Sequence, residues 1–337
     1  MTPPRPLITV VIPALNAEAW IGETLASVAA QTYPHDRLEI VLVDDGSTDA
    51  TAERARAELK AGDIAHVVLR NPSSLGPSAA RNRGWRSGRG NWIQFLDSDD
   101  LLEPSKIELQ ATAAVAVSND VAALYSNWGR LTMVDQPSRQ VATWFEPRIG
   151  EDQLLDVLRA ESFLQVGCLL FSREWLEKTG GFDESCRLIE DVDLLMRLVM
   201  ANGRLHRVPT DRPVSWYRQR EGSLSRESDQ AFIDGCLRNA RFAERFWTNQ
   251  DALTPTRADL IAAIYFMGAR FYAARDHRAA SASLLADIDR LVPNFLPPGS
   301  QTLRWLSRVL GYRRAETIAA HHRRWRRAFR SVGAPAQ

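Results

Sequence analysis

Three carboxylates stand close together in the stretch Phe95-Leu96-Asp97-Ser98-Asp99-Asp100, directly after an apolar run that begins at Trp92. The apolar run predicts a buried strand, and this strand would deliver the carboxylates onto an acidic turn. Carboxylate oxygens are the ligands that Mg²⁺ and Mn²⁺ prefer, and both cations commonly bind phosphates as well. The stretch by itself is equally typical of a turn that ends a strand and caps a helix after Pro104. The surrounding sequence is therefore needed to distinguish the two interpretations.

The residues around the acidic turn predict alternating strands and helices. The first run, Leu7–Ile12, is rich in β-branched residues, which is typical of a strand covered on both faces. We expect Pro13 to end this strand, and Ser47 or Thr48 to cap the helix after the second strand. The expected strands are 7–12, 39–43, 64–69 and 92–96, and the expected helices are 19–30 and 77–86. This order indicates a doubly wound α/β domain with a mostly parallel sheet.

Three loops of this predicted domain should meet in one crevice. They are Pro13–Asn16, Asp44–Asp45 and Asp97–Asp100, and each follows a predicted strand. Ligands of open α/β sheets bind outside the carboxyl ends of the strands, which is where these loops belong. Neither a Gly-x-Gly-x-x-Gly turn nor a phosphate-binding loop ending in Gly-Lys-Ser/Thr occurs at these positions. A metal ion is therefore expected to bind the phosphates in place of a glycine-rich loop.

Four motifs, taken in order and spacing, resemble family 2 glycosyltransferases of the GT-A fold. They read VIPALN at 11–16, VDDGSTD at 43–49, GPSAARN at 76–82 and FLDSDD at 95–100. The resemblance covers about residues 7 to 225 and says little about the acceptor. It implies a GT-A catalytic domain at 1–226, with a nucleotide-sugar half at about 1–100 and an acceptor half at about 101–226. It also implies inverting transfer from a nucleotide-diphosphate sugar, assisted by Mn²⁺ or Mg²⁺.

The resemblance gives each acidic residue of the donor site a role. Asp45, or its neighbour Asp44, would accept a hydrogen bond from the nucleotide base, the alternative being a turn that caps the next helix. Asp97 would face the ribose with Ser98 beside it, and Asp99 would ligate the metal. An ordinary solvated turn is the alternative for Asp97, Ser98 and Asp99. It is the weaker interpretation, because the other three motifs occur together with this one.

Three further donor contacts are expected, each with a plain alternative. Arg81 lies one turn into its predicted helix, where a guanidinium could reach a diphosphate oxygen, and a surface arginine is nearly as good an interpretation. Pro13 and Leu15 would line the base pocket, or they are simply a strand end with a core leucine.

The candidate general base is in the second half of the catalytic region. Leu194, Leu195 and Leu198 mark the apolar face of a helix, and Glu190–Asp191 lie at its N-terminus, where the helix dipole favours an ionised carboxylate. The pair resembles the Glu-Asp motif of the family, which implies Asp191 as the base, with a near-normal pKa, and Glu190 as the residue that positions the acceptor. Two acidic caps on a helix are the alternative.

One departure from the family pattern concerns the metal. Many relatives have a histidine after the last strand that completes the metal shell, whereas Arg220 occupies the matching place here and cannot bind a cation. Either Asp99, phosphates and water hold the metal, or Arg220 neutralises the diphosphate, with Arg218 as a second candidate. Both arginines could equally be solvated loop residues.

The pattern changes to helices from Ser228 onward, so we expect an all-helical region at 227–337 that acts as a cap or as the surface of a homodimer. Its end is distinct, because residues 301–337 carry a formal charge of +8 and residues 1–300 carry −7. Apolar residues from Leu303 to Phe329 recur beside arginines at helical spacing, which predicts a basic amphipathic helix. It could lie on an anionic membrane or pack against the protein. No motif suggests binding to nucleic acid.

Composition sets the remaining expectations. The 337 residues are 45% hydrophobic, and the three cysteines form no Cys-x-x-Cys pair, so neither a disulfide framework nor a zinc site is indicated. No apolar run approaches the roughly 20 residues that a membrane-spanning helix needs, and Met1–Pro6 contains no signal-peptide core. We therefore expect a cytoplasmic protein, with peripheral contact to the inner face of the membrane through 301–337.

The sequence thus predicts a metal-dependent inverting glycosyltransferase with a UDP-sugar as the favoured donor. The acceptor would be a saccharide or a lipid-linked saccharide in polysaccharide or glycoconjugate synthesis. A catalytically silent nucleotide- or sugar-binding module of the same fold is the main alternative. A nucleotidyltransferase fits less well, because residues 14–17 are not the glycine-rich basic loop that such an enzyme needs after its first strand.

Overall fold

The computed structural model describes residues 5–134, 139–186, 188–219, 228–298 and 301–319. The chain divides into two compact units, Met1–Gly235 and Cys236–Gln337, and each is described here by itself. The boundary expected from the sequence, after residue 226, lies outside the described residues.

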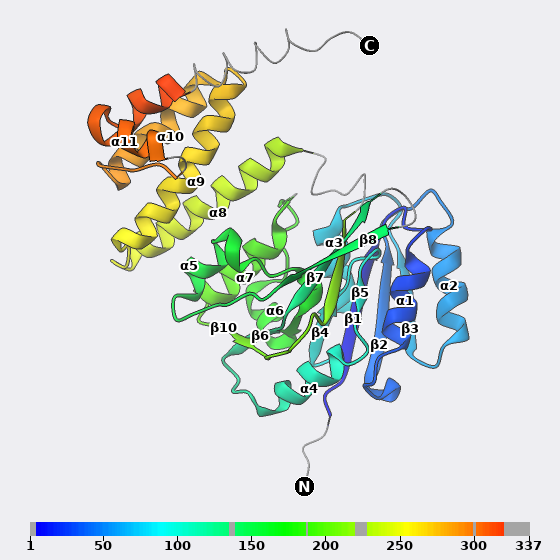
Figure 1. Cartoon of the computed structure of the whole chain (residues 1–337). Coiled ribbons are helices and arrows are strands. Elements are labelled where there is room, and N and C mark those ends of the chain that lie inside the picture. The colour runs from blue at the N-terminus through cyan, green and yellow to red at the C-terminus, as the bar shows by residue number, and fades with distance from the viewer. Residues whose placement is uncertain (1–4, 135–138, 187, 220–227, 299–300, 320–337) are drawn as a thin grey trace, which may run out of the picture. The chain divides into compact units, whose positions relative to one another are not determined.

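A mostly parallel sheet forms the centre of the first unit (Figure 1). Among the described residues its seven strands lie in the order β10-β6-β9-β4-β1-β2-β3, and β9 alone runs antiparallel to both of its neighbours. This arrangement confirms the predicted fold class. The strands are β1 (Ile8–Ala14), β2 (Leu38–Asp44), β3 (Ala65–Arg70), β4 (Trp92–Phe95), β6 (Val121–Tyr125), β9 (Leu169–Ser172) and β10 (Arg204–Arg207).

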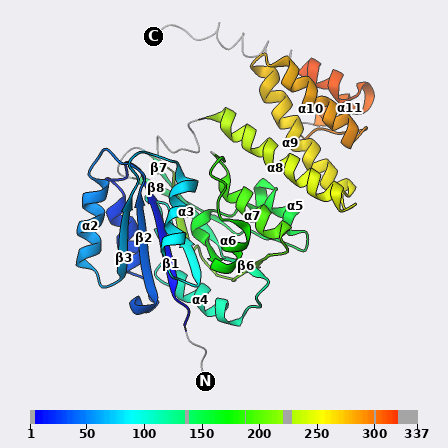
Figure 2. The same cartoon turned by 180° about the vertical axis from the view of Figure 1, so that it is seen from behind.

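Helices cover both faces of this sheet, and Figures 1 and 2 show α1 and α3 on opposite sides of it. Alternate residues of the strands explain this layering, because neighbouring side chains of a strand point to opposite faces. Ile12 and Leu42 belong to the core cluster of α1 and α2, whereas Val43 packs with Ala80 of α3. The helices are α1 (Ile21–Ala29), α2 (Thr51–Ala61), α3 (Pro77–Ser87), α4 (Lys106–Ala116), α5 (Gln153–Val157), α6 (Arg173–Thr179) and α7 (Glu190–Met200).

The first strand does not end at Pro13, which corrects the expectation from the sequence. Pro13 pairs with Val43, and β1 continues to Ala14. The carbonyl of Ala14 accepts a hydrogen bond from the N–H of Asp45, the residue after β2, and that of Val11 accepts one from the N–H of Leu96. The backbone N–H and C=O groups of odd-numbered residues in β1 therefore point toward β4. Pairing with β4 stops at Val11, and the missing N–H of Pro13 therefore leaves no bond of the sheet unmade.

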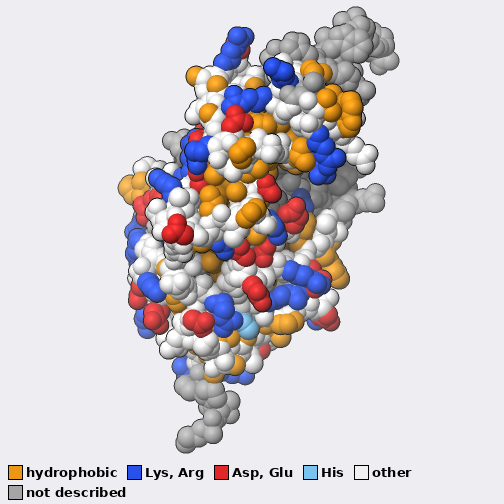
Figure 3. Space-filling view, turned by 90° about the vertical axis from the view of Figure 1, so that its left-hand side faces the viewer, with side chains coloured by type: hydrophobic (Ala, Val, Ile, Leu, Met, Phe, Trp, Pro, Cys, Tyr) orange, Lys and Arg blue, Asp and Glu red, His pale blue; other side chains and the backbone are white. Residues whose placement is uncertain are grey.

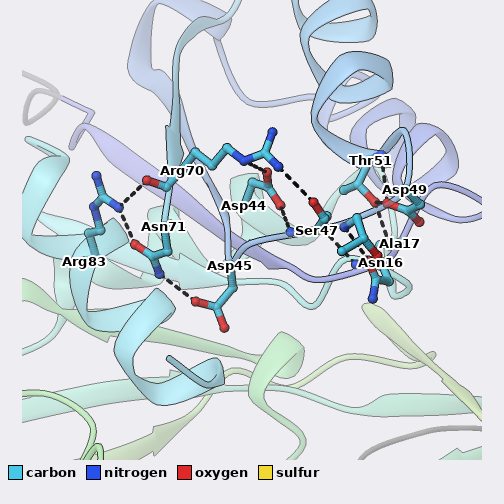
Figure 4. A network of polar contacts seen from close by, with 11 residues as sticks. Asn16, Ala17, Asp44, Asp45, Ser47, Asp49, Thr51, Arg70, Asn71 and Arg83 are labelled. Carbon is cyan, nitrogen blue, oxygen red and sulfur yellow. Dashed lines mark hydrogen bonds and ion pairs between the residues drawn. The ribbon is translucent and has the colours of Figure 1, made fainter. Parts of the chain in front are cut away.

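The cap predicted for the second helix is also wrong. The α2 helix begins at Thr51, and the side chain of Asp49 accepts the backbone N–H of that residue at 3.0 Å. Ser47 and Thr48 are used elsewhere: the hydroxyl of Ser47 accepts the Asn16 N–H at 3.0 Å, and the Thr48 N–H donates to the Asn16 side chain at 2.9 Å. Figure 4 shows this network, which ties the loop after β1 to the loop after β2.

A second, smaller sheet extends the first unit, with strands in the order β5-β11-β7-β8. It brings β11 to the acidic turn, because the Arg218 N–H donates to the Asp100 carboxylate at 2.8 Å. The strands are β5 (Leu101–Leu102), β7 (Trp128–Val134), β8 (Arg139–Phe145) and β11 (Ser215–Gln219).

The second unit is helical in its described residues, as the sequence predicts. Trp247, Tyr265 and Phe266 are buried in its core, and the ring of Phe266 makes edge contacts with Phe295 and Tyr312. None of the helices formed by the described residues is both long and apolar enough to cross a membrane. Residues 320–337 of the predicted basic amphipathic end lie outside the described residues. The helices are α8 (Asp229–Asn249), which begins in the first unit, α9 (Pro255–Ala274), α10 (Arg278–Leu291) and α11 (Gln301–Leu310).

Charges on the face drawn in Figure 3 are mixed, with acidic and basic side chains interspersed among apolar ones. This agrees with the formal net charge of +1 for the whole chain.

The close packing of α3 on the sheet yields a test of the fold. A Cβ atom at Gly84 would lie 2.3 Å from Cγ1 of Val11, so we expect Gly84→Ala to lower the free energy of unfolding by about 1–3 kcal/mol. Gly62→Ala is the matched control, because its new Cβ would meet nothing closer than 3.7 Å. Chemical denaturation of both variants measures the difference, and equal stabilities would contradict the packing.

Candidate active site

A cavity of about 440 Å³ lies at the carboxyl ends of the central strands. It brings together most of the residues singled out in the sequence, although they come from segments far apart in the chain. Pro13 lies near the end of β1 and Leu15 directly follows that strand, and the acidic turn after β4 forms another part of the wall. The predicted site residues in its lining are Pro13, Leu15, Asp45, Arg81, Asp97, Ser98, Asp99, Glu190 and Asp191.

Asp44 is not in the lining of this cavity, which removes it from the donor contacts expected from the sequence. Its side chain is fully buried and accepts the Ser47 N–H at 2.9 Å. The Arg70 guanidinium lies 3.3 Å from its second oxygen (Figure 4). As the last residue of β2, Asp44 therefore holds its own turn together.

Asp45 does line the cavity, and its carboxylate already has several donors from the protein. The side chain of Asn71 donates to it at 2.6 Å and the hydroxyl of Ser74 at 2.8 Å. The backbone N–H groups of Leu75 and Gly76 donate at 3.0 and 2.9 Å. Asp45 thus fixes the loop that leads into α3, and the φ of +95° at Gly76 completes the turn.

Arg81 is placed differently from the expectation of a diphosphate contact. Its guanidinium joins two carboxylates, with Nη2 2.6 Å from Asp97 and Nη1 2.7 Å from Glu190. The side chain is only 6% exposed and also lies over the ring of Phe182. Burial lowers the pKa of Arg81, but the attraction of Asp97 and Glu190 outweighs it and raises the pKa above its usual value. Arg81 therefore links the acidic turn to the start of α7.

The three carboxylates of the acidic turn have separate surroundings. Asp97 and Asp99 line the cavity, whereas Asp100 is buried beneath them. Asp100 accepts the Arg218 N–H at 2.8 Å and the side-chain amide of Gln165 at 2.7 Å. Burial, followed by the charges of Asp99 and Asp97, raises the pKa of Asp100 well above its ordinary range. Asp100 is a structural anchor, and Asp97 and Asp99 are the carboxylates that a ligand can reach.

Arg218 is not available for the diphosphate, contrary to its candidacy from the sequence. Its side chain is 3% exposed, forms an ion pair with Glu23 at 2.6 Å and lies over the ring of Trp20. Because side chains alternate along a strand, its neighbour Tyr217 lines the cavity instead. Arg220, the first candidate, lies outside the described residues.

Glu190 and Asp191 begin α7 at the wall of the cavity. The residue before them, Ile189, has φ +55° and ψ +33°, a left-handed conformation that a β-branched residue rarely adopts. Such strain persists only where the surroundings impose it, and here it aims the first turn of α7 at the cavity.

The pKa of Asp191 is not near normal, which corrects the expectation from the helix dipole. Burial raises the pKa of Asp191 to about 7, and the adjacent charge of Glu190 adds to the rise. One hydrogen bond from the Val192 N–H, at 2.8 Å, and the more distant charge of Arg81 act in the opposite direction. The carboxylate is thus poised to exchange a proton close to neutral pH.

Several lining residues were not predicted from the sequence. Gln165 and Tyr217 reach the cavity only because the smaller sheet and the segment before β9 fold over the acidic turn. Nothing in their local sequence distinguishes them, since their contacts are long-range. The unpredicted lining residues are Ala14, Ser74, Gly76, Pro77, Ala80, Phe163, Gln165, Val166, Leu188, Ile189, Tyr217 and Phe232.

Two solved structures show a similar fold at low sequence identity. Staphylococcus aureus TarS 1-349 in complex with UDP-GlcNAc matches with a TM-score of 0.65 and 20% identity, covering 94% of this chain and 91% of that one. The mannosyltransferase PcManGT from Pyrobaculum calidifontis, in complex with GDP-Man and Mn²⁺, matches with a TM-score of 0.55 and 21% identity, covering 86% and 88%. Both likenesses concern the fold.

Curated relatives are more similar in sequence. Succinoglycan biosynthesis protein ExoO of Rhizobium meliloti is 30% identical over 254 residues, which cover 70% of this chain and 69% of ExoO. O-antigen biosynthesis protein RfbC of Myxococcus xanthus is 32% identical over 231 residues, 68% of this chain and 17% of RfbC. The putative teichuronic acid biosynthesis glycosyltransferase TuaG of Bacillus subtilis is 38% identical over 110 residues, 33% of this chain and 42% of TuaG. The chain thus spans less than half the length of each of the last two.

The family model described as glycosyl transferase family 2 matches residues 9–180. The match includes all four motifs at the carboxyl ends of the strands and stops before Glu190 and Asp191, whose placement rests on the structure. Because the model matches more than half of the chain and ExoO matches along most of its own length, this chain belongs to glycosyl transferase family 2 and has the GT-A fold.

Proposed function

We propose that this chain is an inverting glycosyltransferase that moves a sugar from a nucleotide-diphosphate donor, preferably a UDP-sugar, to a hydroxyl of a saccharide or lipid-linked saccharide. One observation carries the proposal: Asp99, at the turn after β4, and Asp191, at the start of α7, line the same cavity. A ligand that fills this cavity would contact both carboxylates. The family and the UDP-GlcNAc complex of TarS support the same donor class.

The donor set in the cavity suits a hard divalent cation. Asp99 would hold Mn²⁺ or Mg²⁺ together with phosphate oxygens and water, a shell typical of cations that bind one carboxylate and a substrate diphosphate. The cation would neutralise negative charge on the departing diphosphate. Within the described ranges, no three His, Cys, Asp or Glu side chains are grouped as ligands. The Mn²⁺ complex of PcManGT, of the same fold, agrees with this assignment.

Asp191 is the proposed general base. Its pKa of about 7 allows it to be ionised near neutral pH while still holding a proton strongly enough to take one from an acceptor hydroxyl. Glu190 would accept a hydrogen bond from the acceptor and so orient it. The ion pair of Glu190 with Arg81 fixes the direction of that carboxylate.

Pro13, Leu15 and Asp45 remain the proposed surroundings of the nucleotide base. Pro13 and Leu15 supply apolar lining, and the carboxylate of Asp45 holds the loop at Ser74–Gly76 that forms another part of the wall. Asp97 and Ser98 would lie near the ribose, as the family motif implies. Arg81 acts between Asp97 and Glu190 rather than as a ligand of the diphosphate.

The relatives ExoO, RfbC and TuaG point to surface polysaccharide synthesis as the setting. Peripheral membrane contact through 301–337 gains support from α11, where Trp305 and Val309 are each 61% exposed at adjacent turns. The homodimer remains a prediction from the sequence.

The silent-module alternative is less favoured, because a binding module needs neither Asp99 nor a base of perturbed pKa.

Nucleotide binding tests the donor class. We expect calorimetry to detect UDP binding that strengthens with Mn²⁺, weaker binding of GDP and dTDP, and loss of the Mn²⁺ effect in Asp99→Asn, since an amide binds a hard cation more weakly. Asp36→Asn, at a side chain that is 79% exposed, is the control and should bind like the wild type. Failure of every nucleotide to bind with Mn²⁺ present would refute the proposal.

The pH dependence of transfer tests the base. Because Asp191 must be ionised to accept a proton, kcat/KM of the wild type should fall below an apparent pKa of about 7 and level off above it. Asp191→Asn should lower kcat by about 10²- to 10⁴-fold and leave UDP affinity unchanged. Asp193→Asn, on the same helix but paired with Arg197, should keep the pH limb of the wild type. If kcat/KM of the wild type instead falls with an apparent pKa near 4, Asp191 is not the base.

A further test concerns Arg81 as a positioning residue. Its charge lowers the pKa of Asp191, so Arg81→Gln should move the pH limb of kcat/KM to higher pH and reduce kcat, while UDP affinity changes little. Arg86→Gln removes a half-exposed charge from the same helix and should leave the limb in place. If Arg81→Gln instead weakens UDP binding and leaves the limb unmoved, Arg81 is a diphosphate ligand.

A further inference from the structure

A second cavity, of about 370 Å³, lies within the helical unit and shares no lining residue with the first. Three helices contribute to it, with four residues from α8, one from α9 and two from α10. Nearly all of its lining side chains are charged. They are Arg238, Arg241, Glu244, Arg245, Tyr265, Asp287 and Arg290.

The cavity carries an excess of positive charge, with four arginines against two carboxylates. Three of the arginines belong to one face of α8, because Arg238, Arg241 and Arg245 are separated by three and four residues. Like charges at this spacing repel one another and weaken a helix. A helix that stacks them on one face gains if an anion binds between them.

Glu244 forms no ion pair with Arg241 or Arg245 within the described ranges. It is mostly buried, and its two oxygens accept the hydroxyl of Tyr265 at 2.5 Å and the guanidinium of Arg290 at 2.6 Å. Asp287 lies 3.6 Å from the same guanidinium. Both carboxylates of the cavity thus face Arg290, and this network links side chains of α8, α9 and α10 in the lining.

Arg241 and Arg245 are exposed and, within the described ranges, form no ion pair. Arg241 lies close enough to Tyr265 for its charge to act on the phenol, although burial and then the hydrogen bond to Glu244 raise the pKa of Tyr265 well above its ordinary value. Arg241 therefore borders this network. Two guanidiniums one turn apart can each direct a pair of N–H groups at a single oxyanion.

We propose that this cavity binds a phosphoryl group, either free or carried by a polyol or sugar, between Arg241 and Arg245. Phosphate has the charge to match the excess of the lining and enough oxygens to accept from two guanidiniums at once. The volume leaves room for a small carrier beside the phosphoryl group but not for a long chain enclosed in the cavity. The site is independent of the proposed transfer reaction.

The rate of chemical modification at each arginine tests whether phosphate binds to this cavity in the full-length protein. Phenylglyoxal reacts with exposed guanidiniums, and mass spectrometry of peptides gives the rate at each arginine. We expect inorganic phosphate and glycerol 3-phosphate to slow modification of Arg241 and Arg245 by about threefold or more, because a bound oxyanion covers both guanidiniums. Arg278 of α10, whose side chain is 87% exposed, should react at an unchanged rate.

Two additions make the result decisive. Arg245→Gln should abolish the protection of Arg241, because a single guanidinium holds phosphate weakly, whereas Arg278→Gln should preserve it. Stronger protection by glycerol 3-phosphate than by inorganic phosphate would identify a carried phosphoryl group as the ligand, and equal protection would identify the phosphoryl group alone.

Sodium chloride at the same ionic strength must not protect. Equal protection by chloride, or protection of Arg241 and Arg245 no greater than that of Arg278, would overturn the proposal.

Discussion

The candidate active site depends on one buried guanidinium. Arg81 forms ion pairs of 2.6 and 2.7 Å with Asp97 and Glu190, and its side chain is 6% exposed. A buried arginine is stable only while its partners stay in place, since removal of either carboxylate would leave charge uncompensated in a poorly solvated setting. The pairing therefore fixes the distance between the end of β4 and the start of α7. Those segments carry the proposed donor and acceptor groups, so their alignment follows from this one interaction.

The acidic residues of the site have the same chemistry and different functions, and burial separates them. Asp44, Asp45 and Asp100 are nearly inaccessible, and they accept hydrogen bonds from backbone N–H groups of loops and of β11 that would otherwise be unpaired. Asp99 is partly exposed in the cavity, where a cation and a diphosphate can reach it. Asp191 is the intermediate case, because it borders the cavity and is still poorly enough hydrated to have a raised pKa. A strained Ile189 holds it there.

The two units of the chain show how charge can be organised for different ligands. In the first, carboxylates converge on a cavity and one arginine neutralises two of them. In the second, arginines of α8 line one cavity, and the two carboxylates of that lining pair with Arg290. The first arrangement suits a cation with a phosphorylated donor, and the second suits a bare oxyanion. Neither arrangement follows from net charge, which is close to zero for the chain as a whole.

The sequence by itself determined the class of the fold, the family and the acidic residues that line the cavity. Continuous apolar strands that end in short polar motifs predict both the packing of helices on the two faces of the sheet and the edge where ligands bind. Both follow from strand direction and side-chain alternation, which are local properties. Only the tertiary structure decided which carboxylate of each pair faces the cavity, as between Asp44 and Asp45, and that Arg81 binds carboxylates. Such choices depend on the twist and packing of several elements at once. The raised pKa of Asp191 was equally beyond the sequence, because the local helix dipole predicts an ionised group and burial by distant segments overrides it.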